Sequence, residues 1–120
     1  MALQEKAVQR HGGAYGVLNL NALAASLAQP QSMVFGHERY ADPIEKAAAY
    51  CYFIACNHPF LDGNKRTGFL AALHFLRKNG LTPFIDDVAL GDAIISAAAG
   101  EIDVDEFVLR FGNAIRSQDK

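Results

Sequence analysis

Apolar residues recur at helical spacing along most of the chain, and polar capping residues mark where the helices begin. A short pattern covers residues 3–10, and a second covers residues 18–28, where Pro30 ends it. Asn19 and Asn21 are both suitable N-caps for the second helix. No stretch shows the strict alternation of a half-buried strand. The pattern therefore predicts a helical protein.

The broadest apolar pattern starts after Asp42 and Pro43, which suit the N-cap and the first helical position. Its apolar residues cover almost every side of a helix, which predicts a place at the centre of the domain. Before this helix, residues 31–42 follow no helical period. Val34 and Phe35, before a glycine, are compatible with a short hairpin, but the length of the segment favours an irregular surface loop, often a lid or binding segment.

Two further helices are predicted after a connector at residues 81–85. Asp86 is placed to cap the first of them, which stops before Gly100. Asp103 and Glu106 have the spacing of a capping box at the start of the second. The end of the chain is therefore expected to contain two helices.

The length and composition are those of one folded domain. The chain has 120 residues, of which 51% are hydrophobic, and a formal net charge of −2. This length can bury a core without disulfides. We therefore expect one all-α domain over residues 1–120, with about six helices and one irregular loop before the central helix.

Charge and cysteine content narrow the environment and the partners. The slightly acidic balance gives no general attraction for nucleic acid or for an anionic membrane. Cys51 and Cys56 lie on poorly matched faces of one helix, so we expect buried thiols in a reducing compartment. The chain shows neither an apolar signal core nor a run long enough to span a bilayer. A cytoplasmic protein is expected.

Most of the residues with useful chemistry lie between His58 and Gly68, in the order His-Pro-Phe-Leu-Asp-Gly-Asn-Lys-Arg-Thr-Gly. An apolar helical pattern follows directly. A helix start has unpaired N–H groups and a partial positive charge, so it is a suitable place for a phosphate. Lys65 and Arg66 oppose the helix dipole at this end, which indicates that an anion binds there.

Individual residues of this segment suit phosphoryl or nucleotidyl transfer. His58 can act as a general base near neutral pH, and Asp62 can ligate Mg²⁺ beside a phosphate. Gly63 permits close approach of a ligand, and Asn64 is a possible cap and ligand contact. Taken singly, each has an ordinary structural role, such as a helix-end histidine or a capping carboxylate. Their combination favours chemistry on a phosphate.

This segment resembles the signature loop of the Fic/Doc family, His-Pro-Phe-x-Asp/Glu-Gly-Asn-Gly-Arg-x-x-Arg. The matching residues are His58, Pro59, Phe60, Asp62, Gly63, Asn64 and Arg66. Lys65 replaces a glycine and Phe69 replaces the second arginine, and both departures are features of the Doc branch, the death-on-curing toxins of toxin–antitoxin modules. The resemblance covers nearly the whole chain, although the first helix is expected to be shorter than in Doc-like chains.

The resemblance implies a Fic fold and a kinase that moves the γ-phosphate of ATP, with Mg²⁺, to a threonine of a translation factor such as elongation factor Tu. This would halt translation. His58 would be the base and Asp62 the Mg²⁺ ligand. The catalytic set would be His58, Asp62, Lys65 and Arg66, and the nucleotide contacts would be Gly63, Asn64, Lys65, Arg66 and Thr67. Lys65 and Phe69 would together reverse the nucleotide, so that the γ-phosphorus faces the nucleophile.

The resemblance also implies a flap and a partner. Residues 32–40 would lay the backbone of the target beside the active site. His37 and Tyr40 in this flap would touch target or nucleotide, or else be an exposed histidine and a half-buried tyrosine. His11 and His74 are expected to be structural. A cognate antitoxin would suppress the activity with a helical segment, because no inhibitory helix is evident in the chain itself.

Three other functions remain open at this point. An ordinary Fic enzyme would transfer AMP instead of phosphate, and Lys65 with Phe69 is the feature that separates the two. A helical binding module without activity would have no need for the intact His58, Asp62, Asn64 and Arg66. A nuclease is disfavoured by the acidic balance. Neither direct binding of nucleic acid nor binding to a membrane is expected.

Overall fold

In the computed structural model, the described residues are 19–58 and 63–116, and they are mostly helical. The elements are α2 (Leu20–Ala28), η1 (Gln29–Gln31), β1 (Met33–Val34), β2 (His37–Glu38), α3 (Pro43–Asn57), α4 (Asn64–Lys78), α5 (Asp87–Ala98) and α6 (Val104–Arg116). The predicted all-α class is confirmed, with one short hairpin added. The helix expected at residues 3–10 lies outside the described residues.

The helices begin where local capping chemistry predicts. The side chains of Asp42, Asp86 and Asp103 each accept a hydrogen bond from a backbone N–H in the first turn, at 2.7, 3.1 and 2.9 Å. Asn19 caps α2 in the same way at 2.9 Å, which decides between Asn19 and Asn21. Such caps satisfy N–H groups that have no acceptor within the helix. The starts of α2, α3, α5 and α6 therefore depend on neighbours in sequence.

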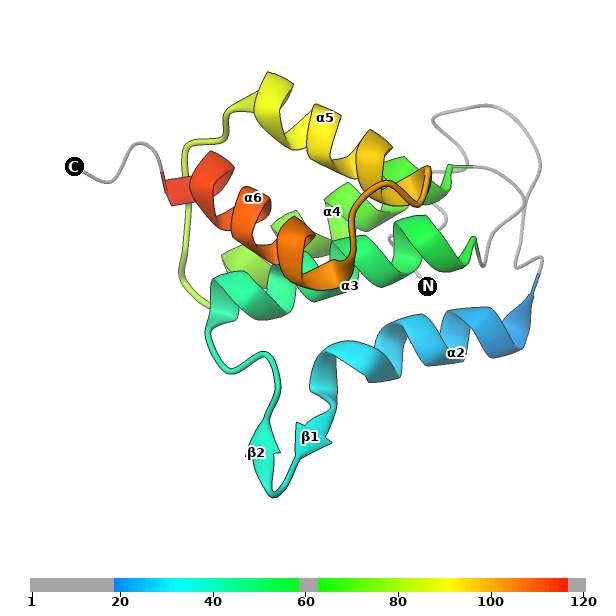
Figure 1. Ribbon diagram of the computed structural model, residues 1–120. Coiled ribbons are helices and arrows are strands. Elements are labelled where there is room, and N and C mark those ends of the chain that lie inside the picture. Colours follow the sequence, from blue (N-terminus) through cyan, green and yellow to red (C-terminus); the bar gives the residue numbers. More distant parts are fainter. Residues whose placement is uncertain (1–18, 59–62, 117–120) are drawn as a thin grey trace.

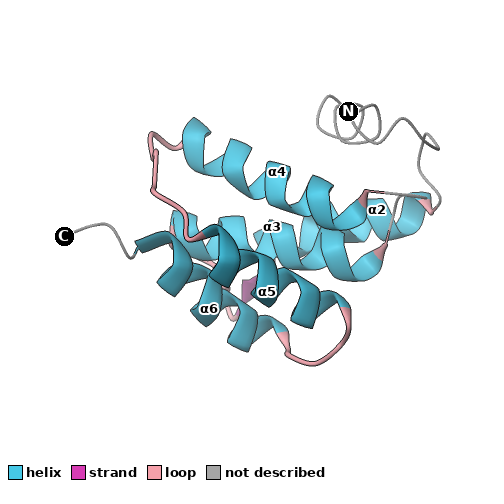
Figure 2. Ribbon diagram, turned by 90° about the horizontal axis from the view of Figure 1, so that it is seen from above, coloured by secondary structure: helices cyan, strands magenta, loops and turns pink. Residues whose placement is uncertain are grey.

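Helix α3 lies at the centre and contacts α2, α4, α5 and α6, as its broad apolar pattern predicts (Figures 1 and 2). Small side chains on α3 allow this close packing, and Ala47, Ala48 and Cys51 have no exposed surface. The core around α3 is completed by Ala55, Ala72, Leu76, Leu90, Ala93, Ile94, Ala97, Phe107, Phe111, Ala114 and Ile115. Burial of this shared face stabilises the arrangement of the helices.

Gly68 marks the closest approach of α4 to α3. A Cβ atom built on Gly68 would lie 2.8 Å from the carbonyl oxygen of Cys51, closer than ordinary van der Waals contact. This oxygen belongs to helical backbone, so it cannot swing aside as a side chain would. Gly68 therefore sets the distance between the two helices on either side of the segment that carries the candidate chemistry.

We expect Gly68→Val to lower the free energy of unfolding by about 1–3 kcal/mol, because the added carbons force α4 away from α3. Gly112→Val is the matched control, since a Cβ at Gly112 in α6 meets no atom of the described residues within 4 Å. That variant should stay within about 1 kcal/mol of the parent. Urea unfolding measures both, and equal stabilities of the two variants would contradict the prediction.

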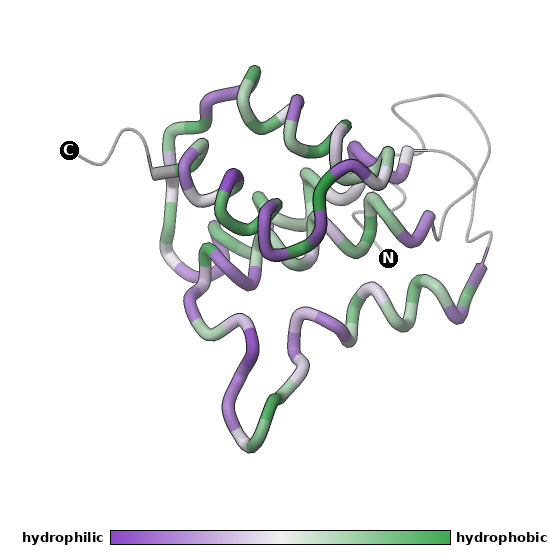
Figure 3. The backbone as a smooth tube through the Cα atoms, in the orientation of Figure 1, coloured by the Kyte–Doolittle hydropathy of each residue, from purple (hydrophilic) through white to green (hydrophobic). Residues whose placement is uncertain are grey.

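The segment before α3 contains a hairpin where an irregular loop was predicted. Strands β1 and β2 are antiparallel, with Val34 opposite His37. Phe35 and Gly36 form the turn with φ of 51° and 82°, and two positive φ values are what a two-residue hairpin turn requires. The prediction was wrong because it weighed the length of the segment above this local turn. The hairpin projects from the body, and its tip is apolar (Figures 1 and 3).

Both cysteines are free thiols, as predicted, but only Cys51 is also buried as predicted. Cys51 is fully buried, and burial raises the pKa of its thiol well above the usual range, so the group is neutral at physiological pH. Cys56 is half-buried, and its Sγ lies 3.3 Å from the carbonyl oxygen of Ala97. The contact connects α3 to α5.

None of the described helices combines the length and the apolar character needed to cross a bilayer.

Candidate functional site

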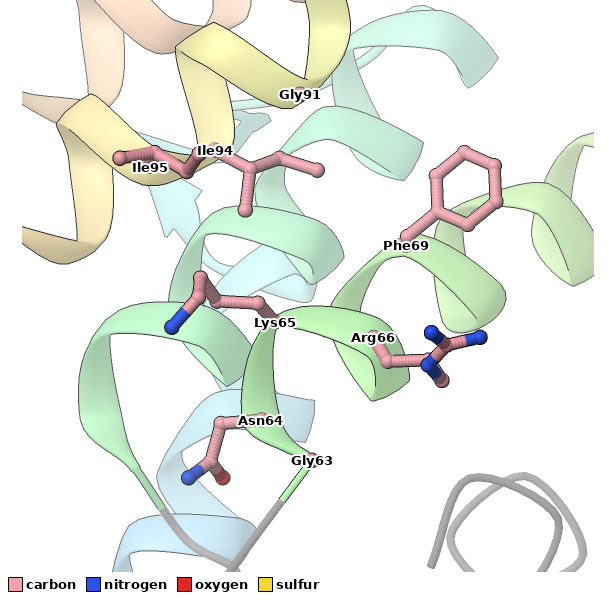
Figure 4. A pocket seen from close by; sticks show the side chains of 8 residues that line it. All are labelled: Gly63, Asn64, Lys65, Arg66, Phe69, Gly91, Ile94 and Ile95. Carbon is pink, nitrogen blue, oxygen red and sulfur yellow. The ribbon is translucent and has the colours of Figure 1, made fainter. Parts of the chain in front are cut away.

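A cavity of about 480 Å³ lies between the start of α4 and the middle of α5, where Gly91, Ile94 and Ile95 line it (Figure 4). Its size is within the range of small-molecule sites. The lining residues are Gly63, Asn64, Lys65, Arg66, Phe69, Gly91, Ile94 and Ile95. Four of these residues come from the segment that the sequence singled out. The four others complete the wall, and three of them belong to α5.

No side chain of the N-cap residue caps the start of α4, unlike the starts of α2, α3 and α5. Gly63 is the N-cap, with φ of +77°, a conformation that glycine adopts without strain. The prediction that Asn64 is the cap is therefore wrong: Asn64 is the first residue of the helix, and its side chain lines the cavity. Because Gly63 has no side chain, the N-cap itself adds no bulk in front of the helix. A ligand is thus able to approach the first turn closely.

Lys65 and Arg66 place two cations on the first turn of α4. Both side chains are exposed. They leave the helix on different sides, and both line the cavity (Figure 4). The structure therefore brings both cations to one cavity without stacking their head groups. This arrangement suits an extended anion with several charged groups, such as a polyphosphate.

His58 ends α3 in an uncommon backbone conformation. It is the C-cap of the helix, with φ of 49° and ψ of 53°, and it is exposed. Glycine and asparagine are the usual residues in this left-handed region, and other side chains there cost about 1–3 kcal/mol. Strain of this kind is common at functional sites. A histidine at this position therefore supports a functional role for its side chain.

A buried polar contact that the sequence did not predict holds the last turn of α3. Ser26 of α2 is fully buried, and its Oγ accepts a hydrogen bond from Asn57 Nδ2 at 3.0 Å. The same hydroxyl lies 2.7 Å from the carbonyl oxygen of Ala22 and 3.1 Å from that of Phe53. Asn57 directly precedes His58, so α2 anchors the residue next to the candidate base. The only signal in the sequence was a serine within an apolar helical stripe.

Thr67 differs from the other predicted nucleotide contacts. Its side chain is buried, with 2% exposure, and it is not among the residues that line the cavity. Its Oγ1 has no hydrogen-bond partner among the described residues. Helical spacing explains this, because residue 67 faces the core when residues 65 and 66 face outward. A direct contact of Thr67 with a nucleotide in the cavity is not supported by this geometry.

The hairpin before α3 has a fixed base. Tyr40 is buried and packs edge-on against Phe53, with ring centroids 6.5 Å apart. Ion pairs connect Glu38 to Lys46, and Arg39 to Asp105 at 3.4 Å. Burial raises the pKa of Tyr40, although the neighbouring Arg39 opposes this. Tyr40 is therefore a structural anchor of the hairpin. It is more deeply buried than the half-buried tyrosine that was one of the two alternatives from the sequence.

Two of the other predicted residues, His37 and His74, are exposed on the described surface. His37 is exposed on β2, so it stays a candidate contact for a target. His74 is exposed on α4, away from the cavity lining. His11 and the predicted Mg²⁺ ligand Asp62 lie outside the described residues. Within residues 19–58 and 63–116, no three His, Cys, Asp or Glu side chains gather into a metal-binding group.

The helical fold and the segment from His58 to α4 together define the class of protein. The chain belongs to the Fic/DOC family, whose model matches residues 1–76. It is similar to Protein kinase doc of Escherichia phage P1, with 38% identity over 104 residues that cover 87% of this chain and 81% of that protein. Toxin Doc of Mycolicibacterium smegmatis is 38% identical over 102 residues, covering 76% of this chain and 78% of that protein. The predicted relationship to the family and to its Doc branch is confirmed.

Proposed function

We propose that the chain is a Doc-type toxin that transfers the γ-phosphate of ATP to a threonine or serine hydroxyl of a translation factor, such as elongation factor Tu. The observation that carries this proposal is 38% identity, across 87% of the chain, to a relative named as a protein kinase. The cavity at the start of α4 supports it, because Lys65 and Arg66 there suit a triphosphate.

Each residue of the proposed site has its own role in the transfer of the γ-phosphate. An imidazole nitrogen of His58 takes the proton of the target hydroxyl, and the hydroxyl oxygen forms a bond to the γ-phosphorus. The bond from that phosphorus to the β–γ bridging oxygen breaks, and its electron pair stays on ADP. Lys65 and Arg66 hold the phosphate charges. Asp62 would ligate Mg²⁺, which neutralises charge on the phosphates when it is bound.

The hairpin is the surface that we assign to the target. Strand β1 and the turn of the hairpin expose Met33, Val34 and Phe35 to 58%, 46% and 96%. Its strands are short and project beyond the helices, so an extended segment of the target is able to lie alongside them (Figure 1). We also propose a cognate antitoxin, which suppresses the activity with a helical segment. The relative from M. smegmatis is named as a toxin, which supports this partner.

Mass spectrometry of elongation factor Tu tests the function directly. After incubation with the protein and Mg-ATP, we expect the factor to gain about 80 Da on one threonine or serine. A gain of about 329 Da would show AMP transfer, the activity of an ordinary Fic enzyme. If elongation factor Tu gains no mass but a different protein in a cell extract becomes phosphorylated, the proposed target is wrong. No transfer to any protein would favour a binding module without activity.

A further inference from the structure

The two ends of the cavity between α4 and α5 differ in chemistry (Figure 4). The end at the first turn of α4 carries Asn64, Lys65 and Arg66. The opposite end is apolar, with Phe69 from α4 and Ile94 and Ile95 from α5. Ile95 leaves 60% of its surface exposed, although it is a large apolar residue. A ligand that matches both ends has an anionic part and an apolar part.

Gly91 lies inside α5 and lines the apolar end. A glycine in a helix interior costs about 1 kcal/mol relative to alanine. Packing does not require a glycine here, because a Cβ on Gly91 would meet no atom of the described residues within 4 Å. The missing side chain instead leaves open space in the wall, and Gly91 also lines an adjoining hollow of about 180 Å³ with Phe69, Leu90 and Ile94. Glycine at such a place commonly allows close approach of a ligand.

We propose that Gly91 keeps open a subsite for the nucleotide base, which lies against Phe69, Ile94 and Ile95 while the triphosphate points to the first turn of α4. This inference rests on the proposed function, because it assumes that the cavity binds ATP. The opposite orientation would place the charged phosphates on apolar side chains and the base between two cations. Asp87, which also lines the adjoining hollow, would further repel phosphate from that end. Charge therefore favours the base at α5.

Two probes distinguish the ends of the cavity: ATP and inorganic tripolyphosphate, each titrated calorimetrically in the presence of Mg²⁺. Gly91→Leu fills the base subsite and leaves Lys65 and Arg66 in place. We expect its Kd for ATP to rise about tenfold or more, with the Kd for tripolyphosphate unchanged within about twofold. Gly112→Leu in α6 is the matched control, since the space around Gly112 is also open. That variant should bind both probes as the parent does.

Three results would overturn the inference, and they have different meanings. If Gly91→Leu binds ATP as tightly as the parent, the base lies elsewhere. If it loses tripolyphosphate as strongly as ATP, residue 91 affects the phosphate end and not a base subsite. If the parent protein binds neither probe, the proposed function fails and the subsite fails with it. Thermal unfolding of both leucine variants shows whether either one has lost its fold.

Discussion

Replacing His58 with alanine is expected to lower the rate of phosphate transfer to the target by about 10²–10⁴-fold. The expected loss is large because the two other described histidines lie elsewhere in the fold: His37 is on β2 of the hairpin, and His74 is in the second half of α4. Transfer of the γ-phosphate from labelled ATP to the target measures the effect. KM for ATP should change little, since the base acts on the hydroxyl and not on the phosphates.

Two further variants separate catalysis from folding. His58→Gly removes the imidazole but suits the left-handed backbone at φ of 49°, so it should fold at least as stably as the parent and still be inactive. His74→Ala removes an exposed histidine of the same domain and should keep full activity. If His58→Gly transfers phosphate at more than about a tenth of the parent rate, His58 is not the base.

Phe107→Ala is expected to have the largest effect on stability, a loss of about 3–5 kcal/mol in the free energy of unfolding. Phe107 in α6 has no exposed surface. Its ring lies 5.8 Å from that of Tyr52 in α3 and 5.9 Å from that of Phe111. Removing it leaves a cavity between α6 and the central helix, and the rigid helices around it cannot close the gap.

Phe84→Ala provides the control for this loss. Phe84 is the same residue type but is 62% exposed, so its removal should change stability by less than about 0.5 kcal/mol. Thermal and urea unfolding of the three proteins measure the difference. A domain of this size has a total stability of about 5–15 kcal/mol, so Phe107→Ala should be largely unfolded at temperatures that the parent tolerates. Similar midpoints for the two variants would show that α6 does not depend on this ring.

The prediction from sequence succeeded where the interactions are local. The cap Asp86 needs only one partner close in sequence, the N–H of Ala89, which donates to Asp86 Oδ1 at 3.1 Å. A few consecutive residues therefore determine where α5 begins. The segment from His58 to Arg66 was also recognisable, because its residue types occur at fixed spacing. The expected irregular loop was wrong because the choice between loop and hairpin depends on two backbone angles, at Phe35 and Gly36.

The chain alone thus determined the described helices, the caps of α3, α5 and α6, and the segment that carries the chemistry. Only the tertiary structure decided that Gly91 and Ile95 complete the cavity, that Ser26 holds the residue before His58, and that Thr67 faces the core. These contacts join residues on different helices, or depend on which side of a helix meets its neighbour. The reason is physical: a cap is satisfied within one turn, whereas a cavity exists only after several helices have packed around it.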